Sequence, residues 1–72
     1  MKKLSTNQTN WIMVTVKNYV DKWISLSPLK DEMWKDVAKE AEDIMRRGRD
    51  DRLLLDMMVA GLSYIEYINK ER

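Results

Sequence analysis

The pattern of apolar and polar residues predicts three helices, the most apolar of which lies near the C-terminus. From Leu53 to Ile68 the apolar residues recur with helical spacing and cover an arc of roughly 200° around a helix. One neighbouring helix covers a narrower band than this. We therefore expect a helix over residues 51–70 at the centre of the fold, packed against two helices, or against one helix and a second copy of the chain.

The first apolar segment predicts a helix over residues 8–25. Ile12, Val14 and Val16 alternate as in a β-strand, and β-branched residues favour strands. A lone strand would have no partner elsewhere in the sequence, however, and the longer pattern has helical spacing. The residues on this helical stripe are Ile12, Val16, Tyr19, Val20, Trp23 and Ile24.

Local signals predict where the second and third helices begin and end. Ser27 followed by Pro28 is typical of a helix N-cap and first position, which gives a second helix over residues 28–47. Gly48 is expected to close this helix in the left-handed conformation, and Asp50 or Asp51 to cap the third. Connections this short make successive helices antiparallel neighbours. The sequence therefore predicts an all-α fold, a small antiparallel three-helix bundle with residues 1–72 as a single domain.

Two features of the predicted helices make specific structural predictions. Gly61 lies inside the third helix, where glycine costs about 1 kcal/mol relative to alanine. A close helix crossing at Gly61, within the bundle or at a dimer axis, would explain it. On the second helix, acidic residues precede basic residues by four positions, a spacing that favours ion pairs. These expected pairs are Asp31 with Lys35, Glu42 with Arg46, and Asp43 with Arg47.

Length and composition limit the classes of protein that fit. A chain of 72 residues without cysteine or histidine has neither a disulfide nor a structural zinc site to reinforce a small core. A homodimer with the third helix at its centre is therefore a further expectation. The net charge of +1 does not favour binding to nucleic acid or to a membrane surface. Without a signal peptide or an apolar run of about 20 residues, we expect a cytoplasmic protein with no membrane contact.

The residue types present provide little for catalysis. Without histidine and cysteine the chain has no imidazole base, no thiolate nucleophile and none of the common zinc ligand sets. The carboxylate pair Glu40 and Asp43 lies on a face rich in basic residues, and Asp50 and Asp51 are accounted for as helix caps. We therefore expect no enzymatic activity, no cofactor and no metal site.

A second group of apolar residues falls outside the predicted core. Exposed aromatic side chains give a large contact area with few rotatable bonds, and are typical of protein-binding surfaces. The candidate partner-binding residues are Trp11, Val14, Val59 and Tyr67. For Trp11 the alternative is that its ring folds over the end of the bundle. The favoured function is a non-enzymatic helical interaction module, a small regulator, adaptor or inhibitor that acts by contact with another protein.

The turn between the second and third helices supports an alternative function. Four guanidinium groups gather there and could bind the phosphates of a nucleic acid. These residues are Arg46, Arg47, Arg49 and Arg52. Asp50 and Asp51 interrupt the cluster, and the competing interpretation is that Arg46 and Arg47 serve the helix end and local ion pairs. A helix-turn-helix motif is disfavoured, because its second helix would be the most apolar segment of the chain.

Overall fold

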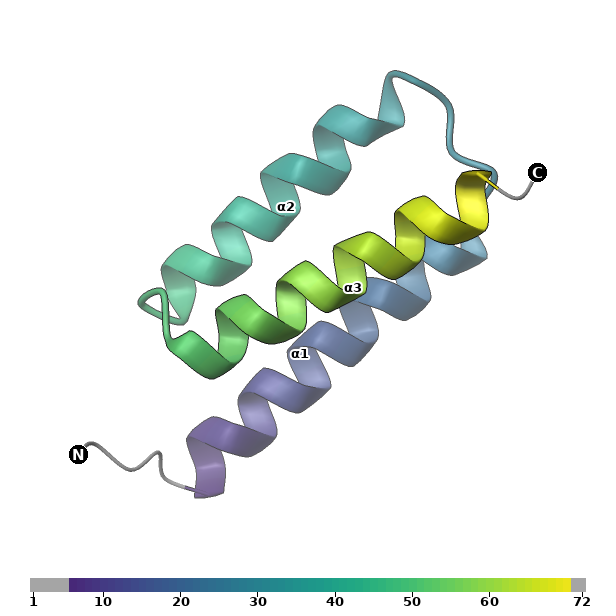
Figure 1. The fold of residues 1–72 in the computed structure, drawn as a ribbon. Coiled ribbons are helices and arrows are strands. Elements are labelled where there is room, and N and C mark those ends of the chain that lie inside the picture. Colours follow the sequence, from purple (N-terminus) through teal and green to yellow (C-terminus); the bar gives the residue numbers. More distant parts are fainter. Residues whose placement is uncertain (1–5, 71–72) are drawn as a thin grey trace.

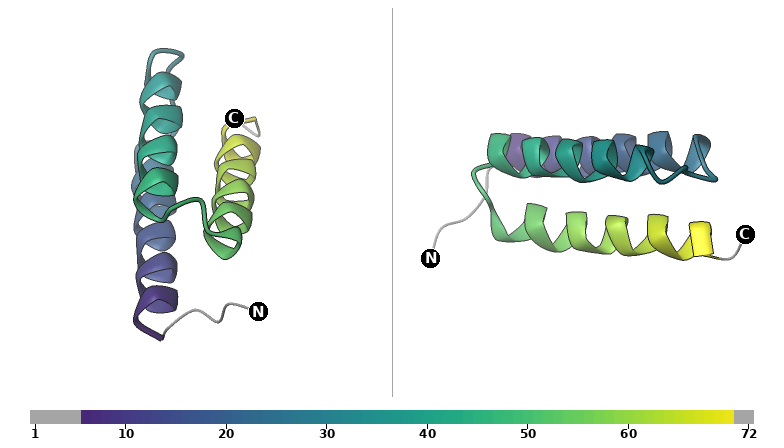
Figure 2. Two further views of the ribbon diagram at one scale, coloured as in Figure 1. Left: turned by 90° about the vertical axis from the view of Figure 1, so that its left-hand side faces the viewer. Right: turned by 90° about the horizontal axis from the view of Figure 1, so that it is seen from above.

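The structure, a computed structural model, describes residues 6–70 and confirms the predicted all-α three-helix bundle. Its helices are α1 (Thr6–Ser25), α2 (Met33–Arg47) and α3 (Arg52–Lys70). Helices α1 and α3 run in the same direction and α2 runs in the opposite one (Figure 1). Both views of Figure 2 show α1 and α2 in one layer and α3 in a second layer. Helix α3 therefore contacts both of the other helices, as its wide apolar arc predicts.

All three helices contribute to one apolar core. Its buried side chains are Ile12, Val16, Tyr19 and Trp23 of α1, Val37, Ala41 and Ile44 of α2, and Leu54, Met58 and Ile65 of α3. Only the middle of the α3 arc is fully covered. Tyr64, which belongs to the predicted arc, is 51% exposed, and Leu62 and Met57 are half-buried. Two neighbouring helices thus leave both edges of the α3 arc partly open.

Helix α2 begins at Met33, so the predicted start at residue 28 is wrong. The Ser27 hydroxyl donates a hydrogen bond to the Trp23 carbonyl oxygen (2.8 Å) and so serves the end of α1 instead of capping α2. The Leu29 amide donates to Oδ1 of Asn69 (2.7 Å), and Nδ2 of Asn69 donates to the Ser27 hydroxyl (3.1 Å). These contacts attach the α1–α2 connection to the end of α3. The polar groups that would begin a helix at Pro28 are therefore committed elsewhere.

Two of the three predicted ion pairs on α2 are present. Arg46 Nη2 lies 3.8 Å from Glu42 Oε1, and Arg47 Nε lies 3.3 Å from Asp43 Oδ2. The pair of Asp31 with Lys35 is not formed within residues 6–70, because Asp31 precedes the first residue of α2. A late helix start thus removes the geometry that the pair requires.

The left-handed residues between α2 and α3 are Arg49 (φ 56°) and Asp50 (φ 53°), so the prediction for Gly48 is wrong. Gly48 has φ −86°. The Arg49 amide donates to the Arg46 carbonyl oxygen (3.0 Å) and the Asp50 amide to that of Met45 (2.9 Å), a Schellman arrangement. Gly48 is instead required for space. A Cβ atom there would overlap Cδ2 of Leu54 and lie 3.2 Å from the Trp11 ring.

The other two local predictions are confirmed. Asp51 caps α3, because its Oδ1 accepts a hydrogen bond from the Leu53 amide (2.9 Å). Gly61 lies at a close crossing of α1 and α3 within the bundle, since a Cβ atom there would be 2.8 Å from Cγ2 of Val20. The turn and the crossing together set how α3 sits against its two neighbours.

Candidate functional site

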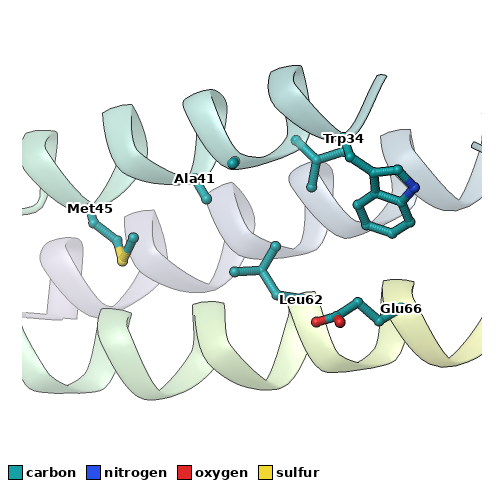
Figure 3. Close-up of a pocket in the computed structure, with 7 residues that line it drawn as sticks. Trp34, Ala41, Met45, Leu62 and Glu66 are labelled. Carbon is teal, nitrogen blue, oxygen red and sulfur yellow. The ribbon is translucent and has the colours of Figure 1, made fainter. Parts of the chain in front are cut away.

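An apolar groove lies between α2 and α3 (Figure 3). We call it the α2–α3 groove and define it by Trp34, Val37, Ala38, Ala41 and Met45 of α2 with Leu62 and Glu66 of α3. Ala41 and Met45 extend from α2 toward α3, where Leu62 faces them, and the ring of Trp34 lies above Glu66 (Figure 3). Its volume of about 330 Å³ lies within the range of known ligand pockets, roughly 300–1,000 Å³.

The groove is open because the apolar residues of α2 extend past the core on one side. Trp34, Met45 and Ala38 lie about 60–100° around the helix from the buried Val37. Trp34 and Met45 are half-buried and Ala38 is exposed. The small side chains of Ala38 and Ala41 leave space that a larger residue would fill, so α2 and α3 are not in tight contact along their outer edge.

One end of the groove is charged. Glu66 is the one charged residue in its lining, and it has no ion pair within residues 6–70. A second hollow continues from this end and shares Trp34 and Glu66 with the groove. Asp31 and Lys70 also line that continuation. The groove therefore combines an apolar floor with an acidic end that carries two carboxylates and one ammonium group.

The four predicted partner-binding residues differ in how far they are exposed. Val14, Val59 and Tyr67 are 56%, 62% and 58% exposed, respectively, in agreement with their predicted position outside the core. Val59 and Tyr67 lie about 80° apart around α3, and the ring of Tyr67 stacks on Tyr64 with centroids 6.4 Å apart. Trp11 is half-buried, and its ring lies over the end of the bundle against Gly48.

The sequence pattern favours core positions for the apolar residues that line the groove and leaves Glu66 facing water. Trp34, Ala38 and Met45 belong to the apolar band of α2, and Leu62 belongs to the arc of α3. The available signal was the width of these bands. The arc of roughly 200° on α3 and the band on α2 that extends about 100° from Val37 are both wider than one neighbouring helix covers. Width alone did not say which edge would be hollow.

The four arginines near the turn differ in their partners. Besides the pairs of Arg46 and Arg47, Arg52 Nε lies 3.1 Å from Asp56 Oδ2 on the surface of α3. Arg49 has no ion pair within the described residues. The ion pairs of Arg46 and Arg47 agree with the helix-end interpretation, and the pair of Arg52 with Asp56 is a further local contact on α3.

A separate hollow at this end of the bundle brings two predicted sites together. We call it the end pocket and define it by Asn7, Gln8 and Trp11 of α1 with Arg47, Gly48 and Arg49. Its volume is about 450 Å³. Trp11 was predicted as a protein contact and the two arginines as a phosphate contact. The structure puts them in one lining.

Polar contacts between α1 and α2 stabilise the fold. The Tyr19 hydroxyl donates to the Val37 carbonyl oxygen (2.6 Å), and Nε1 of Trp23 and Nζ of Lys22 both donate to Oε1 of Glu40 (2.9 and 3.1 Å). Burial, with the nearby charge of Glu40, raises the pKa of Tyr19 to about 12, so this phenol stays protonated at neutral pH. Among residues 6–70, no group of three acidic side chains is placed to hold a metal ion.

No protein-family model, curated protein or solved structure matches this chain. None of the helices within residues 6–70 combines the length and the apolar character needed to cross a membrane.

Proposed function

We propose that this protein is a non-enzymatic interaction module, a small regulator, adaptor or inhibitor, that holds a helix of another protein in the α2–α3 groove. One observation carries the proposal: an apolar groove with an unpaired carboxylate at its end lies open on the surface of the described bundle. Because the chain has no cysteine, we propose a reducing compartment such as the cytoplasm for this contact.

The dimensions of the groove suit a short amphipathic helix. Trp34 and Met45 mark its two ends on α2, and eleven residues of helix span roughly 16 Å, about three turns. A partner helix that presents apolar side chains at every third or fourth position would place one of them between Ala38, Ala41 and Leu62. The flexible side chain of Met45 can adapt its shape to an apolar anchor, and the ring of Trp34 gives a large contact area with few rotatable bonds.

Charge complementarity specifies the partner further. Glu66 lies one turn after Leu62 on α3, and Asp31 lines the continuation of the groove beside it. A lysine or arginine one turn from the apolar anchor of the partner would face these carboxylates. Lys70 lines the same continuation and weakens their field without removing it. We therefore propose a basic amphipathic helix as the occupant.

A matched pair of alanine substitutions tests this proposal. Ala38 and Ala60 are both exposed alanines within helices, and only Ala38 lines the groove. The tagged full chain is used to capture partners from cells, and each captured protein is then measured against both variants. Ala38→Arg should abolish capture because it fills the groove with a charged side chain, whereas Ala60→Arg should retain it. A partner that is lost with Ala60→Arg and kept by Ala38→Arg would refute the groove as the site.

A second copy of the chain is the other occupant to consider, since the sequence leads us to expect a homodimer. The same variants decide this point. Sedimentation of the purified chain would show a dimer that dissociates with Ala38→Arg if two copies pair through the groove. If the chain is a monomer, or if its dimer persists with Ala38→Arg, the groove is free to bind a different protein.

A further inference from the structure

We propose that the end pocket binds a nucleotide, free or within a single strand of nucleic acid, by stacking its base on Trp11 and holding its phosphate with Arg47 and Arg49. The three side chains come from two segments that are far apart in the sequence, and the fold brings them into one lining of about 450 Å³. This site goes beyond the proposed protein contact. It lies at the opposite end of the bundle from Glu66, so the two sites are independent.

Trp11 provides a stacking surface that is already fixed in place. Its ring packs beside Gly48, where even a Cβ atom would come within 3.2 Å of Cζ3, and Trp11 also lines the pocket. A half-buried ring held by backbone loses little freedom when a base stacks on it. Stacking on an aromatic side chain is tolerant of base identity, because every base has a π face.

Arg47 and Arg49 offer donors for a phosphate in different ways. Arg47 is fixed by its ion pair with Asp43 through Nε, which leaves its remaining N–H groups available. The backbone of Arg49 is held in the left-handed conformation by the Schellman hydrogen bonds of the turn, and its side chain has no ion pair within residues 6–70. Each guanidinium group can bind phosphate oxygens through parallel N–H···O hydrogen bonds.

The remaining lining favours a nucleotide over a simple anion. The side-chain amide of Asn7 is of the type that pairs with the donor and acceptor edges of an unpaired base. Asp43 forms an ion pair with Arg47, and Asp50 follows Arg49 in the sequence. These two carboxylates offset much of the positive charge of the arginines, so the site is not strongly basic. Binding should therefore depend on stacking of the base on Trp11 and on contact of the phosphate with the arginines, more than on net charge. A duplex hides its base faces and should bind poorly.

The test uses the full chain labelled with ¹⁵N and two probes, adenosine monophosphate and a short single-stranded oligoadenylate. Both should shift the Trp11 indole and Gly48 amide resonances, and inorganic phosphate at the same concentration should not shift the indole. Stronger binding of the oligonucleotide would identify nucleic acid as the source of the ligand, and equal binding a free nucleotide.

Two variants with a matched control complete the test. Arg49→Gln should weaken binding by about tenfold, while Arg52→Gln, at an exposed arginine that does not line the pocket, should leave it within about twofold. Trp11→Leu should weaken binding by a similar factor to Arg49→Gln, and Arg49→Gln keeps the test decisive should Trp11→Leu unfold the chain. Equal losses for Arg49→Gln and Arg52→Gln, equal binding of duplex and single strand, or unchanged Trp11 and Gly48 resonances would each overturn the proposal.

Discussion

Replacing Arg49 with glycine should stabilise the bundle, and replacing the adjacent Gly48 with alanine should destabilise it. The turn between α2 and α3 has a left-handed residue at position 49, and the glycine precedes it. Arg49 forms no ion pair within the described residues, so its side chain can be removed without loss of such a contact. The two substitutions therefore separate backbone conformation from available space at neighbouring positions.

The expected magnitudes follow from the geometry. A non-glycine residue in the left-handed region costs roughly 1–2 kcal/mol, and glycine loses about 0.5–1 kcal/mol of this gain through its greater freedom in the unfolded chain. Arg49→Gly should thus stabilise by about 0.5–1 kcal/mol. At Gly48 (φ −86°) alanine suits the backbone, but its Cβ would overlap Leu54, which is fully buried and cannot move aside. Overpacking of this kind costs about 1–3 kcal/mol.

Urea denaturation followed by circular dichroism measures both effects, and thermal melting gives a second reading of them. In a domain of this size each kcal/mol shifts Tm by about 4–8 °C, so the two variants should melt on opposite sides of the parent protein. Equal m values in the urea transitions would show that only stability has changed. A destabilised Arg49→Gly would mean that Gly48, as the sequence suggests, is the left-handed residue. A Gly48→Ala variant as stable as the parent protein would contradict the overlap with Leu54, and either result would refute this description of the turn.

Three further predictions concern the contacts that hold the helices together. Asn69→Ala should destabilise the bundle by about 1–3 kcal/mol, because it removes the acceptor of the Leu29 amide; an unchanged urea midpoint would show that this hydrogen bond contributes nothing. Gly61→Leu should lower Tm, whereas Ala60→Leu, at an exposed neighbour, should not; equal melting of the two would contradict the close crossing with Val20. Tyr19 has a pKa of about 12, against the ordinary value of 10.0 that applies to the unfolded chain. The neutral phenol therefore contributes fully to the stability of the fold below pH 10, and this contribution is lost as the pH rises through 12. Tyr19→Phe should remove that part of the alkaline loss, and an unchanged pH profile of the urea midpoint would contradict it.

Much of the fold follows from periodicity in the sequence. The spacing of Ile12, Val16 and Tyr19 identifies the buried face of α1, and the same argument gives Leu54, Met58 and Ile65 on α3. These positions are predictable because burial depends on a repeat that each helix carries within itself. The width of the α3 arc also predicts correctly that this helix contacts two others.

The start of α2 and the role of Gly48 were not predictable, because both depend on distant residues. The Ser27–Pro28 signal for a helix start is outweighed by Asn69, which binds the connection from the far end of the chain. Gly48 is required by the side chains of Leu54 and Trp11, which no local rule about helix ends includes. Local rules describe isolated helices, and tertiary contacts can override them.

The candidate sites were only partly predictable for a related reason. Sequence identified Trp11, Arg47 and Arg49 as unusual, but their meeting in one pocket depends on how α1 crosses the turn. The α2–α3 groove lies where the small side chains of Ala38 and Ala41 leave space between the two helices. The separation of two helices is a property of the whole core and is not written in either helix alone.

A photo-crosslinking amino acid at position 38, compared with the same residue at position 60, tests the proposed function most directly. Position 38 lines the α2–α3 groove and position 60 is exposed outside it. The proposal predicts that illumination in cells links position 38, and not position 60, to a basic amphipathic helix of a different protein. Crosslinks of equal strength from both positions, or from position 38 only to another copy of this chain, would contradict it.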